Sequence, residues 1–565
     1  MSLSKIDFIY LGIIFIVSCI LVSDLFLTPG RLATFDGAVH ITQIAQFSAA
    51  IKDGDFPVAW LDGFANYGLP LGIFAQQLPT YLGAFFNTIV DNPVLSFNLV
   101  FFVGVFLSNI FYYYFLRIYF QPTYAFFGSF LFNLAPYRII DVYIRGVTPE
   151  IFSMIFLPLI LISIYYLVQK RSSNAIFLLI FSFVCLILTH PIMFVTYSFI
   201  YIPYFIFNLI KKDLDKGSSI FNKDSFKLIL LFTLSLLMAL GLTSYYILPL
   251  NIETKYLYFG SQNHFSLPSY MSLVNYFDPQ WHYFYREDIF TRGHIIKSGI
   301  MEISIVIIGL MIIFYRVTKK KFIKSISILD FAVVMSIVII FFTLKYSTFI
   351  YQNVNILSNI QHQWRMMSAF IFLPPIIIVC ILEKINKRYV LILLVLLICW
   401  SRFPQIYGKN FTIFSEQSYY FTPINLHSVN MNTIWSGKSE DYPVKRNKIE
   451  IIKGSGNIES KKISNSSREY VVNAKTNLNI VDYTFYFPGW NVYVDNKLVP
   501  IQFQDPGYRG VITYLVPKGQ HKIQIIFQDT IVRKIAKIIS ILSIGILTLF
   551  FLLRKTVLSK VYKYD

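Results

Sequence analysis

Long apolar stretches recur along this chain, and most of them are long enough to cross the hydrocarbon core of a lipid bilayer. The first, over residues 6–27, lacks an Ala-x-Ala cleavage site, so we expect a retained helix rather than a signal peptide. Another, over 124–140, is expected to be one helix. Charged residues make up 14% of the chain, against about 25% in soluble domains. The pattern predicts a polytopic α-helical membrane protein with about twelve transmembrane helices.

The formal net charge of +19 would fit a nucleic-acid partner, but the positions of the basic residues argue against one. Short connections between apolar stretches carry them, at 170–171, 211–212, 319–321, 384–388 and 554–555. Such connections mark the cytoplasmic side of a membrane protein. We therefore expect a multi-pass protein of the cell membrane with cytoplasmic N- and C-termini and no nucleic-acid partner. Arg533, Lys534 and Lys537 fall on the other side of the last stretch, where we expect them to snorkel to the interface.

Between residues 405 and 531 the chain becomes polar, and its apolar residues alternate as in strands. Hairpin turns are predicted at 495–496 and 518–519. Five strands are predicted, over 470–473, 480–487, 490–494, 511–516 and 521–527. We therefore expect a transmembrane domain over 1–404, an extracytoplasmic domain resembling a β-sandwich over 405–531, and a final helix with a basic tail over 532–565.

The connection at 28–93, predicted to be a long outer loop, is the region richest in candidate site residues. Asp36 and His40 are four residues apart, which places them on one face of a helix. A carboxylate and an imidazole so placed can share a proton or bind a divalent metal. The plainer interpretation is a helix N-terminus that Asp36 caps, with His40 in the first turn.

The same loop continues with a stretch rich in glycine and proline, from Pro57 to Pro70. This density predicts tight turns, and a long loop held by tight turns is usually functional. Trp60, Asn66 and Tyr67 lie in this stretch and are candidate substrate-site residues.

A second polar segment, 136–150, lies at the predicted outer membrane surface. Arg138, Asp141 and Arg145 are spaced to be neighbours on a helix. Because guanidinium groups donate paired hydrogen bonds to phosphates, two arginines at this level indicate a phosphate site. The plainer interpretation is a helix end held by ion pairs. Glu150 is weaker evidence, since acidic residues are common in the first turn of a helix.

Two further candidates lie at predicted outer helix ends. His190 precedes a proline at a helix turn, where a structural histidine is at least as frequent as a catalytic one. Trp364 suits the aromatic belt of a membrane interface, and Arg365 beside it is placed to meet an anionic head group.

Taken together, these segments resemble the YfhO-like integral membrane proteins and the related pyruvoyl-tetrahydropterin-synthase-related membrane proteins. The residues that carry the resemblance are Asp36, His40, Pro57, Trp60 and 66–70; Pro136, Tyr137, Arg138, Asp141, Tyr143, Arg145, Gly146 and Glu150; Gln361, Trp364 and Arg365; and 488–490, Val492, Val494, Asp495, Pro517, Gly519 and His521. Two departures concern substrate fit: His362-Gln363 replaces a Phe-Pro pair, and 76–79 replaces a Tyr-Pro-Pro run.

That family is similar in architecture to GT-C glycosyltransferases, which take a sugar from a polyprenyl-phosphate carrier on the extracytoplasmic face. The resemblance implies a polyprenyl-phosphate-linked sugar as donor, membrane lipids around it, and an extracytoplasmic glycan, lipid or protein as acceptor. It makes Asp36 the catalytic residue, with His40 tuning it or helping to hold a metal such as Mg or Mn. Arg138, Arg145 and Arg365 then bind the donor phosphate. The remaining substrate-site candidates are Asp141, Tyr143, Glu150, His190 and Trp364, beside Trp60, Asn66 and Tyr67.

Two other function classes stay open. A transporter or flippase of lipids or lipid-linked glycans also has many spans and basic residues on its path. Transporters, however, place ionisable residues mid-bilayer in broken helices, whereas these candidates gather at outer helix ends. A non-catalytic cell-envelope scaffold, whose outer domain binds a partner, is the third class.

Overall fold

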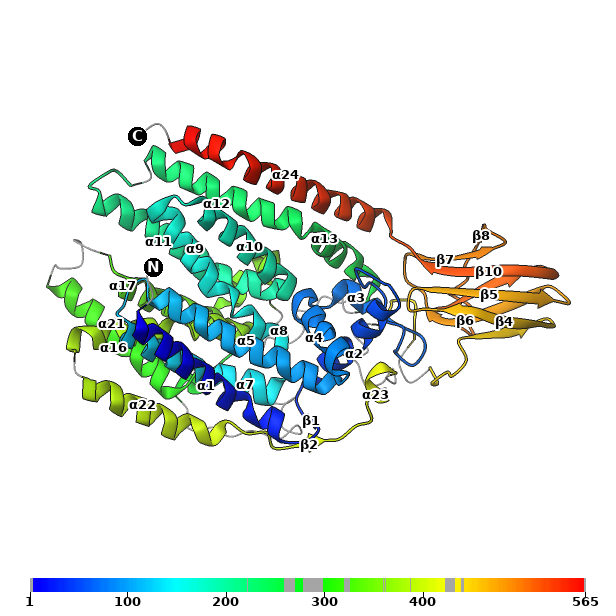
Figure 1. The fold of residues 1–565 in the computed structure, drawn as a ribbon, viewed down its shortest axis with the longest axis horizontal. Coiled ribbons are helices and arrows are strands. Elements are labelled where there is room, and N and C mark those ends of the chain that lie inside the picture. Colours follow the sequence, from blue (N-terminus) through cyan, green and yellow to red (C-terminus); the bar gives the residue numbers. More distant parts are fainter. Residues whose placement is uncertain are drawn as a thin grey trace.

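The structure is a computed structural model that describes residues 4–220, 222–258, 270–277, 298–319, 326–358, 360, 362–386, 388–421, 432–437 and 442–562. A bundle of helices forms the larger part, and a β-domain projects from one end of it (Figure 1). Helix α1 (Lys5–Leu27) begins, and α24 (Ile531–Tyr562) ends, at the opposite end of the bundle (Figure 1).

Eight helical stretches among the described residues are long and apolar enough to span a membrane. They are Lys5–Leu27 (α1), Pro93–Leu116 (α5), Thr148–Lys170 (α8, Thr148–Ser153, and α9, Phe156–Lys170), Pro191–Asp215 (α11), Lys223–Leu242 (α12), Ile300–Thr318 (α16), Gln363–Ile385 (η4, Gln363–Met366; α20, Met367–Phe370; α21, Leu373–Ile385) and Ile531–Leu553 within α24. Three shorter apolar helices are Ser173–Thr189 (α10), Ile328–Thr343 (α17) and Tyr389–Gln405 (α22, Arg388–Arg402, with η5, Phe403–Gln405). The predicted polytopic helical fold is confirmed, while the number of about twelve spans stays a prediction.

Shorter elements connect these helices. They are β1 (Arg31–Leu32), α2 (Gly37–Lys52), α3 (Leu71–Phe74), α4 (Gln77–Val90), α6 (Pro122–Asn133), α7 (Pro136–Ile140), η1 (Asp141–Arg145), α13 (Ser244–Glu253), η2 (Thr254–Tyr256), α15 (Val274–Phe277), η3 (Lys345–Ser347), α18 (Thr348–Asn353), α19 (Asn355–Ser358), β2 (Phe411–Thr412) and α23 (Gln417–Tyr420). The predicted single helix over 124–140 is wrong: α6 ends at Asn133 and α7 starts at Pro136, because the residue before a proline is disfavoured in helical conformation.

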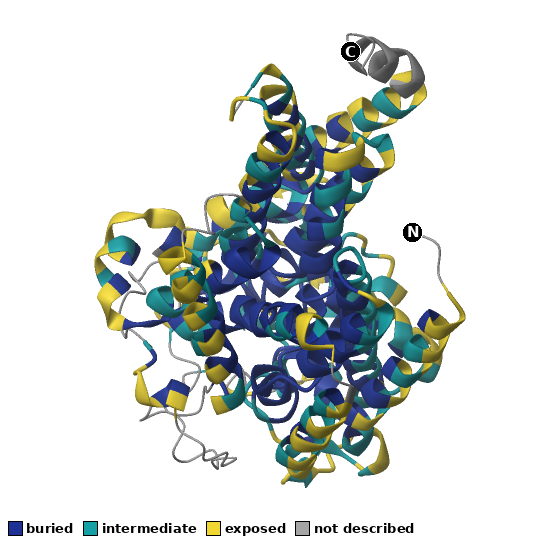
Figure 2. Cartoon of the chain, turned by 90° about the vertical axis from the view of Figure 1, so that its left-hand side faces the viewer, coloured by how far each residue is buried: buried dark blue, intermediate teal, exposed yellow. Residues whose placement is uncertain are grey.

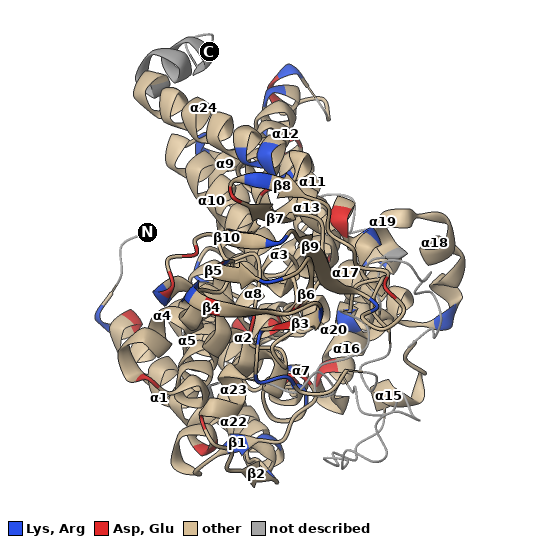
Figure 3. Cartoon of the chain, turned by 90° about the vertical axis from the view of Figure 1, so that its right-hand side faces the viewer, with Lys and Arg blue, Asp and Glu red and all other residues tan. Residues whose placement is uncertain are grey.

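Buried residues fill the middle of the bundle, and exposed residues lie on its outside (Figure 2). The outer faces of α1, α12, α16 and α24 expose many large apolar side chains, such as Ile541 and Leu542. Charged residues are sparse on the long helices (Figure 3). An apolar outer surface around a packed core is what a lipid environment favours, because lipid does not penalise exposed hydrocarbon as water does.

The segment 28–93 is largely helical rather than an irregular loop. Helices α2 and α4 pack against each other and against α5. Tight turns join them, since Ala65, Asn66 and Gly68 all have positive φ. Glycine and proline interrupt its apolar residues, so no helix here reaches the length of a membrane span.

The β-domain consists of two antiparallel sheets that share one hydrophobic core. Its strands are β3 (Ile449–Lys453), β4 (Gly456–Ile463), β5 (Ser467–Ala474), β6 (Leu478–Phe485), β7 (Trp490–Val494), β8 (Lys497–Val499), β9 (Val511–Val516) and β10 (Gly519–Phe527). The strand orders are β4-β5-β10-β7-β8 and β3-β6-β9. The five predicted strands are confirmed, as is the turn at 495–496, where both residues have positive φ. The hairpin predicted at 518–519 is wrong, because β9 and β10 lie in different sheets and do not pair. The sequence did not indicate β3, β4 and β8.

Segment 53–67 docks on the β-domain along what we call the seam. Its residues are Asp53, Asp55, Trp60, Asp62 and Tyr67 on one side and Lys448, Asn465, Arg468, Phe485 and Trp490 on the other. Asp62 accepts hydrogen bonds from Lys448 (2.8 Å) and Arg468 (2.6 Å). Asn465 donates to the carbonyl of Trp60 (2.6 Å). The seam therefore fixes the first loop to a domain nearly 400 residues later in the chain.

Of the basic residues at the start of α24, Arg533 differs from the snorkelling prediction. Arg533 is buried and pairs with Glu253 through Nε and Oε2 at 2.9 Å, and it donates to the carbonyl of Pro488 (2.8 Å). Lys537 pairs with Asp529 at 2.5 Å. Snorkelling is therefore wrong for Arg533, since a buried partner on α13 holds its guanidinium inside the protein.

Candidate functional site

A buried arginine–carboxylate network lies where η1 meets α8. Nη1 of Arg145 donates to Asp141 (2.5 Å), to Glu150 (2.7 Å) and to the hydroxyl of Tyr137 (3.2 Å). Tyr137 in turn donates a very short hydrogen bond to Glu150. The predicted proximity of Asp141 and Arg145 is thus seen in the structure, with Glu150 and Tyr137 added to it, whereas the hydrogen bonds of Arg138 go elsewhere.

The backbone places Asp36 directly beside this network. The amide of Asp36 donates to the carbonyl of Arg145 (2.8 Å), and the amide of Phe35 donates to that of Ile144 (3.1 Å). Element η1 is a single π-helical turn that ends at Gly146 with φ +67°. A side chain at Gly146 would collide with Thr34, so the glycine permits this close approach. Such π turns occur often at functional sites.

The carboxylate of Asp36 does not cap α2, although Asp36 stands at the N-cap position. The hydroxyl of Thr34 accepts the amide of Gly37 instead (3.2 Å). Within the described residues, no hydrogen bond or ion pair engages the Asp36 carboxylate. It lies close enough to His40, Arg145 and Arg365 for their charges to interact. The capping role that a helix start suggests is therefore not what this side chain does.

Two histidines face the same space. His40 is buried on the first turn of α2, and burial lowers its pKa below 6.5 even though the charge of Asp36 raises it. His190 is 4% exposed between α10 and α11, and it lies within electrostatic reach of His40, Arg145 and Arg365. A neutral His40 leaves the arginines as the positive groups around Asp36 near pH 7.

Trp364 joins η4 to this site. Its ring stacks on His362, with 5.2 Å between ring centres and planes 11° apart, and the guanidinium of Arg145 lies 4.5 Å from its centre. Arg365 follows it and interacts electrostatically with Arg145 and Asp36. We call Asp36, His40, Tyr137, Asp141, Arg145, Glu150, His190, Trp364 and Arg365 the site cluster.

Several polar atoms of this region are buried without a hydrogen-bond partner among the described residues. They are Oδ2 of Asp141, Nδ1 of His190 and Oε1 of Gln363. Buried polar atoms are nearly always paired in folded proteins, so unpaired ones require an explanation. A polar ligand that reaches these atoms would provide it.

The other predicted site residues are held by packing, although Arg138 lies within electrostatic reach of Asp141. Arg138 is fully buried and donates to Ser108 (3.0 Å), to the carbonyl of Val105 (3.2 Å) and to Asn133 (3.3 Å). Tyr143 donates to the carbonyl of Leu21 on α1 (2.9 Å). These contacts account for both side chains by helix packing.

Trp60, Asn66 and Tyr67 belong to the seam or adjoin it. Trp60 packs edge-on against Trp490, with 5.2 Å between ring centres, and Tyr67 stacks on Phe485 at 5.0 Å. The carbonyl of Asn66 accepts a short hydrogen bond from Lys448. Their substrate role stays a prediction, and packing explains their positions.

Sequence reasoning did not assign a role to Tyr137 and His362. Tyr137 was visible only as part of a family signature, and His362 only as a departure from one. Tyr137 contacts Arg145 and Glu150, which lie on two elements that follow α7, and His362 contacts Trp364 by stacking of the rings. Residue spacing alone does not reveal either kind of contact.

The predicted metal pair receives no third ligand. Among the described residues, no group of three or more His, Cys, Asp or Glu side chains is arranged to hold a metal ion. Asp36 and His40 alone do not fit a Mg²⁺ or Mn²⁺ site, which normally draws on several oxygen ligands.

Comparison with known proteins gives a family and remote likenesses. Residues 74–409 match the family described as 6-pyruvoyl-tetrahydropterin synthase related domain, membrane protein. An uncharacterized protein of Lactococcus lactis subsp. cremoris (strain MG1363) is 25% identical over 259 residues, which cover 44% of this chain and 41% of that protein.

Two crystal structures of an Archaeoglobus fulgidus oligosaccharyltransferase are similar to this chain. The complex with Zn and sulfate has 12% identity and a TM-score of 0.38, covering 71% of this chain and 54% of that one. The apo form has 13% identity and a TM-score of 0.40, covering 76% and 60%. The chain thus spans about two-fifths to three-fifths of the proteins it matches.

Proposed function

Because this chain belongs to the membrane-protein family described as 6-pyruvoyl-tetrahydropterin synthase related, we propose that it is a membrane glycosyltransferase. In this proposal it moves a sugar from a polyprenyl-phosphate donor to an extracytoplasmic glycan, lipid or protein. The β-domain and the site cluster face the extracytoplasmic side, and both termini are cytoplasmic.

One observation carries the proposal: the Asp36 carboxylate stands at a helix start without capping it, facing His40, Arg145 and Arg365. A carboxylate kept free of structural bonds beside fixed positive charges suits a general base next to an anionic leaving group. The buried unpaired atoms of Asp141 and His190 support a polar ligand in the same place.

The reaction we propose is a direct displacement. The acceptor oxygen forms a bond to the anomeric carbon while the bond from that carbon to the phosphate oxygen breaks. Asp36 takes the acceptor's proton, and the lipid phosphate leaves with the electron pair of the broken bond. Attack opposite the leaving group inverts the anomeric centre.

Two further roles, positioning of Asp36 and stabilisation of the leaving phosphate, are assigned to arginines. Arg145 already gives its donors to two carboxylates and a tyrosine, and its carbonyl fixes the backbone of Asp36. We therefore assign Arg145 to positioning Asp36, and Arg365 to the leaving phosphate. Arg138, whose guanidinium is bound within helix packing, takes no part in this assignment.

The test is sugar transfer in proteoliposomes supplied with a panel of polyprenyl-phosphate sugars, comparing the wild type with Asp36→Asn. This change removes the charge and nearly keeps the shape. We expect Asp36→Asn to bind donor but to transfer about 10²–10⁴ times more slowly, as for loss of a general base.

Asp91→Asn is the matched control, because Asp91 is an exposed residue that ends α4 and pairs only loosely with Lys52, at 3.7 Å. It should transfer at the wild-type rate. Equal transfer by wild type and Asp36→Asn would remove the catalytic role of Asp36. If no donor is consumed but labelled lipid crosses the bilayer, the protein is a transporter instead.

A further inference from the structure

The packing of α24 on α12 and α13 fixes the depth of the start of α24. Helix α12 has 20 residues, which span about 30 Å and therefore match the hydrocarbon core of a bilayer. The hydroxyl of Ser540 donates to the carbonyl of Gly241 (3.2 Å) and accepts the amide of Tyr245 (2.9 Å). Ser540 thus lies at the outer edge of that core. Lys537, three residues earlier, lies about 4.5 Å further out, at the level of lipid head groups.

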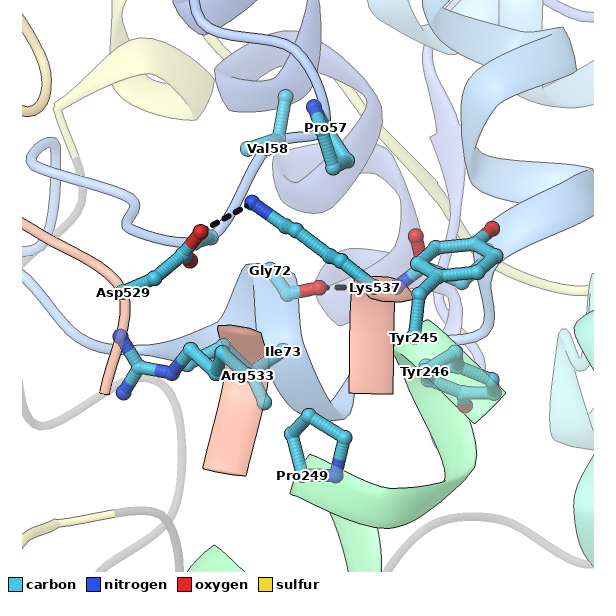
Figure 4. Close-up of a pocket in the computed structure, with 12 residues that line it drawn as sticks. Pro57, Val58, Gly72, Ile73, Tyr245, Tyr246, Pro249, Asp529, Arg533 and Lys537 are labelled. Atoms are coloured by element: carbon cyan, nitrogen blue, oxygen red, sulfur yellow. Dashed lines mark hydrogen bonds and ion pairs between the residues drawn. The ribbon is translucent and has the colours of Figure 1, made fainter. Parts of the chain in front are cut away.

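A hollow opens at this level between three parts of the chain (Figure 4). The first loop contributes Val58 and Gln77, α13 contributes Tyr245 and Tyr246, and the start of α24 contributes Lys537 with Asp529 just before it. The side chain of Lys537 extends across the hollow toward Asp529 (Figure 4).

Each cationic side chain that lines the hollow is paired with a carboxylate. Arg533 also lines it, but Glu253 and two carbonyl groups occupy its guanidinium. Lys537 and Asp529 pair at 2.5 Å with side chains 40% and 30% exposed. Ion pairs this exposed contribute little and are readily exchanged for other partners. An ammonium group has three donors, and within the described residues Asp529 is the one hydrogen-bond partner of Lys537.

We propose that this hollow binds the head group of a zwitterionic phospholipid in the outer leaflet. Its phosphate lies on Lys537 and its ammonium on Asp529, beside the rings of Tyr245 and Tyr246, which also attract cations. The acyl chains run along the exposed apolar face of α24, where Ile538 and Ile541 lie. A purely anionic head group fits less well, because Asp529 repels it.

The test uses the purified full-length chain in detergent and follows its melting temperature as short-chain phosphatidylethanolamine is added. We expect a saturable rise for the wild type and at least tenfold weaker binding for Lys537→Met and for Asp529→Asn. Lys537→Arg keeps the charge, and its affinity for the lipid should stay within about threefold of the wild-type affinity. This result would show that a substitution at position 537 does not by itself prevent folding. Lys534→Met is the matched control, since Lys534 neighbours the hollow without lining it, and should bind as wild type does.

Two further ligands test whether the hollow prefers a zwitterionic head group and whether it requires the acyl chains. Short-chain phosphatidylglycerol should bind at least tenfold more weakly, and equal binding would overturn the zwitterionic assignment. Glycerophosphoethanolamine, the same head group without chains, should need at least a hundredfold higher concentration, and equal potency would overturn a lipid as the ligand. Unchanged binding by Lys537→Met and Asp529→Asn would remove the site altogether.

Discussion

Two ionic groups in this protein have similar components but differ in how one carboxylate of each is paired. In the seam, Asp62 accepts from both Lys448 and Arg468, while Nε and Nη1 of Arg468 have no hydrogen-bond partner in the described part of the chain. In the site cluster, Arg145 donates to both Asp141 and Glu150. Yet the Asp36 carboxylate has no hydrogen bond or ion pair within the described part of the chain.

The difference distinguishes a carboxylate that is paired within the fold from one that is left accessible to a ligand. Asp36 is only partly buried, so water or a polar ligand can supply the partner that its carboxylate lacks within the protein. We therefore infer that the paired carboxylate of Asp62 holds two parts of the fold together, whereas the carboxylate of Asp36 is available to a substrate under the proposed function. The following variants test this distinction.

The largest effect is expected when Arg145 is removed. Arg145→Gln leaves Asp141 and Glu150 buried without their cation, and we expect the free energy of unfolding to fall by about 5 kcal/mol. The double variant Arg145→Gln, Glu150→Gln should regain at least half of this loss. Chemical denaturation measures both values, and a double variant no more stable than the single one would contradict the network.

Asp62→Asn in the seam should cost less, about 3 kcal/mol, because Lys448 can give up its proton. Burial lowers the pKa of Lys448 to about 8, so Lys448 is neutralised at little expense, and Arg468 keeps Asp482 as a second carboxylate, with 3.9 Å between Nε and Oδ2. Transfer per folded molecule should equal that of wild type at low temperature. A loss of transfer without loss of stability would show that the seam takes part in the reaction.

The free energy of unfolding should also depend on pH through His40 of the site cluster. Because the folded-state pKa of His40 lies below its unfolded value of 6.5, the unfolded chain binds a proton first as pH falls. Stability should therefore drop below about pH 6.5, by up to about 1.4 kcal/mol per pH unit. His40→Gln should show a shallower slope between pH 7 and 5 in thermal melts. An unchanged slope would mean that the pKa of His40 is not lowered in the folded protein.

The smallest effect is expected at the centre of the seam. Trp60→Phe keeps an aromatic ring against Trp490 but loses the long hydrogen bond from the indole to Asp62 (3.4 Å), at a cost of about 1 kcal/mol. Transfer should be unchanged in rate and in donor preference. A changed Michaelis constant for donor or acceptor would instead restore Trp60 to the substrate site.

The membrane fold and most of the site were predictable from local signals. Apolar length indicated the helices, alternation indicated five strands, and the spacing of Asp36 with His40 and of Asp141 with Arg145 indicated neighbours. Arg138 shows where such reasoning fails. A regular helix would place it beside Asp141, but its side chain packs toward α5 and α6 while η1 continues as a π turn.

The seam was not predictable, because it joins residues about 400 positions apart. Nothing near Trp60 or Asp62 indicates that their partners are Trp490, Lys448 and Arg468. Aromatic and charged residues in a glycine-rich loop looked like substrate contacts, and burial against another domain places similar demands on side-chain type. Long-range pairing of this kind requires the three-dimensional structure.

The course of α2 has a consequence for anyone who exchanges parts between members of this family. Asp36 precedes its first residue, and Asp53 after its last accepts the amide of Asn465 in the β-domain (3.0 Å). One helix of 16 residues, about 24 Å long, thus joins the candidate catalytic carboxylate to the β-domain. A chimera cut only at residues 405 and 531 would leave half of the seam behind. A β-domain from a relative should graft successfully only together with its own counterpart of residues 53–70.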